Sequence, residues 1–284
     1  LESLRRATVA KRTWSGNTSG AWGTASNWVE AAVPIAADDV LIPAGAALIT
    51  GSDQSATALG YVLVEEGYAT AIGAAPTAGA AAVFLKLNCT RFEFGGSGVS
   101  YIDLGASAIS PRVFGTAAAA TGKHGLYLKG SALATLSVDK GNVGLAALHG
   151  ETATVTTART AGSSATLKLG AGVTVTTVQV LDGTIEQRCA STTSTAMAGE
   201  LRTKEVGAIT TLNGFGGLVY PESTGTITTL NIEGANVDFT RSGAARTVTT
   251  TNWKRGELAA GPAVTFTNNP IPPTDRNWRA SLAV

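Results

Sequence analysis

Cysteine, histidine and charged residues are all scarce in this chain. Its 284 residues include two Cys, two His and one Met, and only 14% are Asp, Glu, Lys or Arg. The isolated cysteines Cys89 and Cys189 make neither a disulfide framework nor a zinc cluster, and we expect both to be small buried apolar residues. The histidines His124 and His149 stand alone beside glycines, which predicts exposed turns and no metal site. The sequence therefore implies no metal and no cofactor.

Other functional classes are disfavoured by what is missing. The net charge is +1, from 21 basic and 20 acidic residues, so the chain lacks the basic balance of a nucleic-acid-binding protein. No run of 18 apolar residues predicts a membrane helix, and no apolar leader follows Leu1, although a chain without an initial Met is compatible with a removed signal. Neither a P-loop nor a G-x-S-x-G nucleophile turn occurs. We expect no nucleic-acid partner and no membrane partner.

A repeat is the strongest positive feature. Seven glycines recur at spacings of 21, 21, 16, 18, 17 and 22 residues, each five or six residues after a threonine. A period near 20 with variable turns is typical of a solenoid. The threonines are Thr135, Thr157, Thr177, Thr193, Thr211, Thr229 and Thr250, and the glycines are Gly141, Gly162, Gly183, Gly199, Gly217, Gly234 and Gly256.

The residues around each threonine predict strands. Segments such as 175–180, 209–212 and 227–232 are rich in β-branched residues with roughly alternating apolar positions. The following glycine would form a corner, since only glycine enters positive φ freely, and a second short strand follows it. We therefore predict an all-β fold: a single-stranded, right-handed parallel β-helix, right-handedness being the usual case rather than a property of this pattern.

Threonines at one position of successive coils have two interpretations. Stacked threonines can pack their methyl groups and exchange hydroxyl hydrogen bonds, which contributes roughly 0.2–1 kcal/mol per pair. A flat outward array of threonines can also bind ice. Because the spacing between repeats varies from 16 to 22 residues, we favour the structural reading over a flat lattice.

Composition divides the chain into five segments. Residues 1–12 form a basic N-terminal arm, and 13–50 form an aromatic, turn-rich cap with the first coil. Longer strands with larger side chains mark 51–130 as irregular coils, and 131–261 are the regular coils. The proline-rich segment 262–284 would close the other end, because a solenoid needs its last strand edge and core covered.

The cap carries a resemblance to a known group. The chain reads W-S-G-N, then W-G-T-A-S-N-W, then V-P and D-D-V-L-I, and this succession resembles the opening of many bacterial and phage β-helix proteins, where it begins the first coil. We expect the tryptophans to fill the end of the core and one of the aspartates to accept turn or cap hydrogen bonds. These cap residues are Trp14, Trp22, Trp28, Pro34, Asp38 and Asp39.

The resemblance covers two kinds of protein, large surface or autotransporter-type proteins and tailed-phage virion proteins. Since no run of barrel strands follows the coils, the chain looks more like a virion component. We predict a non-enzymatic structural protein of a bacteriophage virion (a capsid decoration, spike or fibre) that contacts other capsid or tail proteins and forms a homo-oligomer. Host-surface glycans are a further possible partner. A bacterial surface or secreted adhesin and a polysaccharide-degrading enzyme are the alternatives.

Candidate sites follow from the charged residues. Arg5, Arg6, Lys11 and Arg12 form the one basic cluster, either a solvated arm or an attachment to an acidic surface. Acids near corners could in principle serve as paired carboxylates, yet they alternate with lysines and arginines, which favours a solvated row. We therefore predict no catalytic residues. The corner acids are Asp139, Asp182, Glu233 and Asp238.

Overall fold

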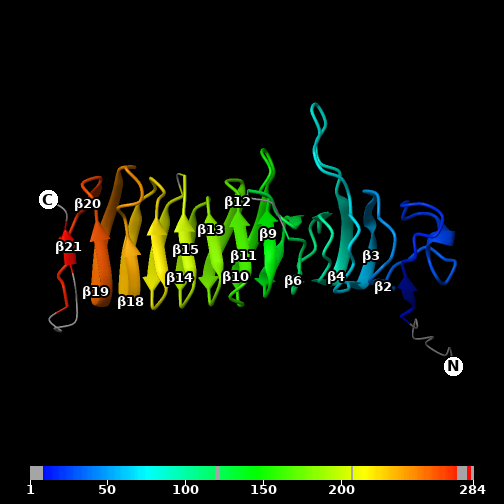
Figure 1. Cartoon of the computed structure of the whole chain (residues 1–284), viewed down its shortest axis with the longest axis horizontal. Coiled ribbons are helices and arrows are strands. Elements are labelled where there is room, and N and C mark those ends of the chain that lie inside the picture. Colours follow the sequence, from blue (N-terminus) through cyan, green and yellow to red (C-terminus); the bar gives the residue numbers. More distant parts are fainter. Residues whose placement is uncertain (1–8, 119–121, 206, 274–279, 283–284) are drawn as a thin grey trace, which may run out of the picture.

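The computed structural model describes residues 9–118, 122–205, 207–273 and 280–282. Their order is a run of β-strands interrupted by one short 3-10 helix, η1 (Ala25–Asn27). All pairings between the named strands are parallel, and the strands follow one another along a rod, as Figure 1 shows. The all-β class and the parallel β-helix are therefore confirmed.

Two parallel ladders run along the rod. Each coil from β2 onward contributes one strand to the first ladder, turns a corner, and then contributes one strand to the second. The first ladder consists of β1 (Lys11–Thr13), β2 (Asp39–Ile42), β3 (Asp53–Val64), β4 (Leu85–Phe94), β6 (Arg112–Val113), β8 (Leu133–Val138), β10 (Ala153–Thr160), β12 (Val173–Val180), β14 (Ser191–Ala196), β16 (Ile209–Gly214), β18 (Ile227–Asp238), β19 (Arg246–Ala260) and β20 (Val264–Phe266).

The second ladder starts from the beginnings of β3 and β4 and ends at the C-terminal side of the rod. The later halves of β18 and β19 belong to it, so these two long strands cross both ladders. Its other strands are β5 (Ser100–Asp103), β7 (Leu126–Lys129), β9 (Gly141–Leu145), β11 (Ala165–Leu169), β13 (Thr184–Gln187), β15 (Glu200–Thr203), β17 (Leu218–Pro221) and β21 (Ala280–Leu282).

One continuous core fills the coils. Inward positions carry Leu, Ile, Val and Ala that are almost fully buried, and successive coils place them in register, as with Leu136, Ala158 and Val178. Full burial of such an aliphatic side chain contributes about 1.5–3 kcal/mol relative to exposure. Every coil thus adds to the same core, which stiffens the rod along its length.

The threonine pairs mark a bend in the first ladder. In β12 burial alternates as far as Val175, and then both Thr176 and Thr177 face outward before Val178 turns inward again. The same break in alternation occurs in β10, β14, β16 and β18. Two successive outward residues mean that the strand bends between them. The bend divides the first ladder into two sides, and with the second ladder each coil therefore has three sides.

The threonines of the repeat stand in one row after this bend. Thr157 pairs with Thr135 and Thr177, and the register continues through Thr193 and Thr211 to the last coils. Seven threonines are thus aligned across neighbouring strands. The variation of 16 to 22 residues lies in the turns and does not disturb the register, so the argument against a regular array that rested on that variation is wrong.

A second array lies before the bend, and we call it the threonine face. It consists of the outward residues two positions apart that immediately precede the row of the repeat, and in every coil from β8 to β20 these are threonine or alanine. The members are Ala132, Ala134, Thr154, Thr156, Thr174, Thr176, Ala190, Thr192, Ala208, Thr210, Thr226, Thr228, Thr247, Thr249, Thr265 and Thr267.

The repeated glycines lie between the two ladders, at the corners. Six have positive φ, for example Gly183 at +79° and Gly217 at +70°. Gly162 does not, and the expected reason for glycine is wrong at this corner. A Cβ there would lie 2.0 Å from the carbonyl oxygen of Asp139 in the previous coil, so the close approach of two backbones requires glycine.

Tryptophans close the N-terminal end of the core. Trp14, Trp22 and Trp28 are at most 2% exposed and pack against one another, with ring centroids 4.7 to 6.2 Å apart. Trp14 and Trp28 also form an antiparallel bridge. This packing places the three indoles in the core rather than on a surface that could stack sugars.

The C-terminal end is built differently. Residues 262–273 and β21 extend both ladders by one strand each, rather than folding over them. Val264 and Phe266 pack against the core but stay partly exposed, and Phe266 meets Phe239 edge to face at 6.1 Å. The described part of the predicted closing segment therefore continues the solenoid, while Trp278 lies outside the described residues.

The irregular coils carry one long excursion. Between β3 and β4 the chain forms a hairpin with antiparallel bridges between Ala74 and Val83 and between Thr77 and Ala80. It rises beyond the outline of the rod as the cyan loop in Figure 1. Its residues are mostly exposed and none is charged.

Candidate functional site

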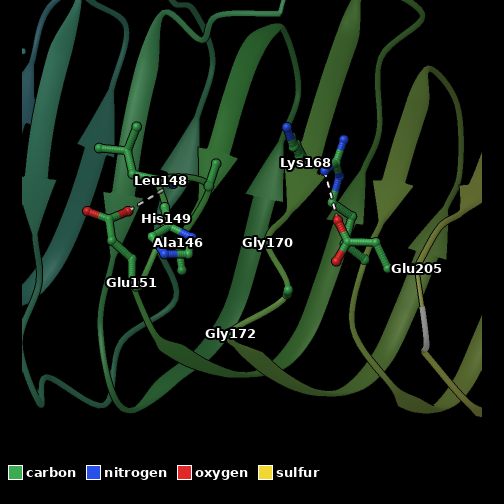
Figure 2. A pocket seen from close by; sticks show the side chains of 12 residues that line it. Ala146, Leu148, His149, Glu151, Lys168, Gly170, Gly172 and Glu205 are labelled. Atoms are coloured by element: carbon green, nitrogen blue, oxygen red, sulfur yellow. Dashed lines mark hydrogen bonds and ion pairs between the residues drawn. The ribbon is translucent and has the colours of Figure 1, made fainter. Parts of the chain in front are cut away.

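Two hollows with polar walls lie beside the second ladder. Residues 146–151, which connect β9 to β10, project between two hollows with volumes of about 310 and 360 Å³. Both hollows include Gly150 and Glu151 in their walls. Figure 2 shows the hollow of about 310 Å³, with Glu151 and His149 on one side and Lys168 and Glu205 on the other. We call the two hollows together the lateral groove.

Glycines explain how the groove forms. Ala146 and Gly150 adopt positive φ, 44° and 77°, which turns the chain outward and back. In the next coil Gly170 and Gly172 pass directly against this excursion, because a Cβ at either position would lie 1.8 or 2.1 Å from the carbonyl oxygens of Ala146 and Glu151. The groove is therefore shaped by backbone contact between neighbouring coils.

Glu151 is an acid of the groove whose pKa is raised. Burial raises the pKa of Glu151, and the charge of Asp103 acts in the same direction, while the backbone N–H of Leu148 and the charge of Lys129 partly oppose the shift. Lys129 Nζ lies 3.6 Å from Asp103 Oδ2. A carboxyl whose pKa is raised in a hollow stays protonated to a higher pH than a solvated one, so it can serve as a general acid.

Aromatic rings form the wall next to Lys129. Tyr101 and Tyr127 stack with ring centroids 4.7 Å apart, and Lys129 Nζ lies 4.2 Å from the centroid of Phe84. All three rings are less than 9% exposed, with Leu148 packed against them. They support the groove from behind and present little ring surface to a ligand.

His124 belongs to this wall, and its expected exposure in a turn is wrong. The imidazole is 7% exposed, meets Tyr127 edge to face and lies with Nδ1 2.5 Å from Asn142 Oδ1. Gly144 makes room for it, because a Cβ there would lie 2.5 Å from the ring. Burial lowers the pKa of His124. His149 is exposed, as expected.

The far side of the groove is held by ion pairs. Arg188 Nε lies 2.6 Å from Glu186 Oε1, and Arg188 Nη1 lies 2.8 Å from Glu205 Oε1. Burial alone would raise the pKa of Glu186, but the hydrogen bond and charge of Arg188 lower it overall. The groove thus offers fixed donors and acceptors of both signs, which suits a polar, uncharged ligand with several hydroxyl groups better than an ion of one sign.

The structure describes two of the four predicted attachment residues, Lys11 and Arg12. Arg5 and Arg6 lie outside the described residues. Lys11 and Arg12 lie in β1, which pairs with β2, so their assignment to an arm is wrong. Lys11 is exposed, whereas Arg12 Nε donates to Asp38 Oδ2 at 2.8 Å and contributes to the cap.

The two aspartates of the cap accept different hydrogen bonds. Asp38 is buried and also accepts from the backbone N–H of Ile35, and Asp39 Oδ1 accepts from the backbone N–H of Tyr61 at 2.7 Å. Burial alone would raise the pKa of Asp38, but the hydrogen bonds from Arg12 and Ile35 lower it. Pro34 is buried beside them.

The corner acids lie along the rod and do not converge on one point. Asp139 pairs with Arg112 at 2.6 Å, Glu233 with Lys254 at 2.8 Å, and Asp182 accepts from the N–H of Gly183. Asp238 is 3.5 Å from Arg241. Cys89 and Cys189 are buried, and burial raises the pKa of each thiol to about 12.

The sequence reasoning missed the groove. Asp103, Lys129 and Glu151 come from three different coils and have no shared motif. The glycine spacing carries no signal of the groove, because Gly141 to Gly162 and Gly162 to Gly183 are both 21 residues apart. Only the strand bounds show that the connection after β9 is longer than the turn after β13.

Comparison with family models, with curated proteins and with solved structures found no match. Within the described ranges no helix has the length and apolarity to cross a membrane. No cluster of three or more His, Cys, Asp and Glu side chains suited to a metal ion was found in that same part of the chain.

Proposed function

We propose that the chain is a non-enzymatic structural rod of a bacteriophage virion. One observation carries the structural part: two parallel ladders and one hydrophobic core continue without a break through the regular coils. The resemblance of the cap to the opening of phage β-helix proteins supports the virion setting.

The rod would work mechanically. Each coil is fixed to its neighbours by backbone hydrogen bonds in two ladders, and side-chain ladders such as Asn252 to Asn231 to Asn213, at 2.8 and 2.7 Å, run in the same direction. Bending would have to break several of these bonds at once. Such a rod holds its two ends at a fixed separation, as a spike or decoration requires.

Purified particles test the proposal. Mass spectrometry of phage particles from a host that carries this gene should find the chain in a fixed ratio to the major capsid protein. A deletion of residues 1–10, which leaves β1 intact, should lower that ratio if the N-terminal segment attaches the rod. Particles without the chain would overturn the virion setting, whereas rapid proteolysis of the purified protein within the regular coils would overturn the rod.

A polysaccharide-degrading enzyme is the second candidate. It is favoured by Glu151, whose pKa is raised in the lateral groove with Asp103 in the same hollow. Paired carboxyls of this kind cleave glycosidic bonds when one stays protonated. Release of reducing ends from bacterial capsular polysaccharide by the wild type, abolished in Glu151→Gln and retained in His149→Gln, would favour this function over the structural one.

A further inference from the structure

The threonine face is the most regular surface of the molecule, and the proposed function does not use it. None of the chain's 21 basic or 20 acidic residues lies on it, although charged residues occupy the outward positions of both neighbouring sides. Its residues are exposed, except for Ala132, Thr247 and Thr249, which are half-exposed. Charge has been excluded from this one side over every regular coil.

Among the described residues, the Thr hydroxyl groups of the face make no hydrogen bond with another protein group. The side of the coil after the bend differs, because Asn213, Asn231 and Asn252, which stand two residues after the threonine row, are hydrogen-bonded to one another. The unpaired hydroxyls of the face are therefore available to water or to a ligand, at fixed positions.

Their positions are set by the backbone in two directions. Along the rod the residues follow the strand spacing of about 4.8 Å, and across it Thr174 and Thr176 are two residues apart on one strand, about 6.6 Å. The β-branched side chain of threonine has few rotamers on a strand, which fixes methyl and hydroxyl positions. In Figure 1 the strands from β10 to β19 stand nearly parallel, so the array keeps its direction.

A protein partner would need a different surface. The centre of a protein interface is enriched in aromatic residues, Met and Arg, which fill pockets on the partner. The threonine face has none of these. Burial against another protein would also leave its hydroxyls without partners, which costs about 1–3 kcal/mol for each buried group. A lattice of water molecules would satisfy each hydroxyl and accept the methyl groups between them.

We propose that the threonine face binds ice. The two spacings of the array are close to the oxygen repeats on the surfaces of hexagonal ice, so hydroxyls and the waters they hold can join the lattice. Adsorbed protein then prevents the crystal from growing at that place. The array is used only as an outward surface, so this function is independent of the virion setting.

Ice affinity of the full-length protein tests the proposal. The labelled protein, in solution with a slowly growing ice hemisphere, should be taken into the ice while bovine serum albumin is excluded. In Thr210→Tyr/Thr228→Tyr the two rings project from neighbouring coils, and uptake should fall to the level of albumin. The matched control, Thr184→Tyr, places the same ring on the second ladder and should keep wild-type uptake.

Folding and assembly are measured on the same samples. Both variants should keep the β circular dichroism spectrum and the melting temperature, because the substituted side chains point to solvent. Exclusion of the folded wild type from ice would overturn the proposal. So would wild-type dimers in sedimentation that the double variant abolishes without any ice uptake, since that result would make the face an interface between copies.

Discussion

Arg12 Nε lies 2.8 Å from Asp38 Oδ2 and joins the first strand of the rod to the tryptophan cap. The side chain of Asp38 is 5% exposed and that of Arg12 18%. The pair is therefore largely removed from water, and each charge depends on the other. A basic residue that looks like part of an arm in the sequence holds the first coil in place.

Loss of Asp38 should destabilise the cap. Asp38→Ala leaves the guanidinium of Arg12 without a counter-charge and the N–H of Ile35 without an acceptor, and breaking such a pair costs about 3 kcal/mol. Tryptophan fluorescence during urea unfolding reports on this end, because Trp14 and Trp22 are buried there. Lys11→Ala, exposed on the same strand, should change the free energy of unfolding by less than about 0.5 kcal/mol. Equal effects of the two variants would contradict this account of the pair.

The corner glycines should tolerate no side chain. Gly183→Ala forces a non-glycine residue into φ +79° and places Cβ 2.4 Å from the carbonyl oxygen of Ala165, so the free energy of unfolding should fall by more than about 2 kcal/mol. Gly243 has open space around its Cβ position and no positive φ, which makes Gly243→Ala the control. Chemical denaturation monitored by circular dichroism compares them. A neutral Gly183→Ala would show that the corner relaxes.

The fold could be predicted because its signals are local and repeated. A threonine such as Thr177 and a corner glycine such as Gly183 recur five or six residues apart in every repeat. The strand residues around the threonine are rich in β-branched types, and apolar positions roughly alternate with polar ones. Only a parallel stack brings such repeats into register. The sequence does not distinguish the two reasons for a corner glycine. Most of these glycines have positive φ, whereas Gly162 is required by backbone contact between coils.

The groove, the bend and the cap pair could not be predicted in this way. Glu151 and Asp103 become neighbours through stacking of coils whose turn lengths differ, and no local pattern gives that offset. Both threonines of a pair face outward because the strand bends, whereas a straight strand would turn one inward. His124 is buried because Gly144 of the next coil has no side chain and leaves room for the imidazole. Such packing between coils is not visible in the sequence.

Acidification should destabilise the protein through His124. Burial lowers the pKa of His124 in the folded state, so the unfolded chain binds the proton more tightly. Stability is then fully present above the ordinary histidine pKa of about 6.5 and is lost as the pH falls below it. His124→Gln keeps a donor for Asn142 without the titration and should flatten this loss between pH 7.5 and 5. Melting temperatures over that range test it, with the exposed His149→Gln as control; a loss of equal size in His124→Gln would assign the effect to other groups.

Removal of a buried cation should stabilise the C-terminal coils. Arg246 is 3% exposed and donates from Nη2 to Ser223 Oγ at 2.8 Å, while its Nε and Nη1 have no hydrogen-bond partner among the described residues. Burial lowers its pKa to about 10, so the guanidinium stays charged at neutral pH at a cost to folding. Arg246→Met fills the same space without charge.

We expect Arg246→Met to raise the free energy of unfolding by about 1–3 kcal/mol, as apolar replacements of poorly compensated buried charges do. Arg241→Met provides the matched comparison, because Arg241 lies at the surface, over the ring of Tyr220 at 3.6 Å and near Asp238. That variant should lose up to about 1 kcal/mol of surface interactions. Urea titration of the wild type and both variants measures these changes in the free energy of unfolding. A loss of stability in Arg246→Met larger than that in Arg241→Met would mean that the buried guanidinium is compensated by a counter-charge and contributes to the fold.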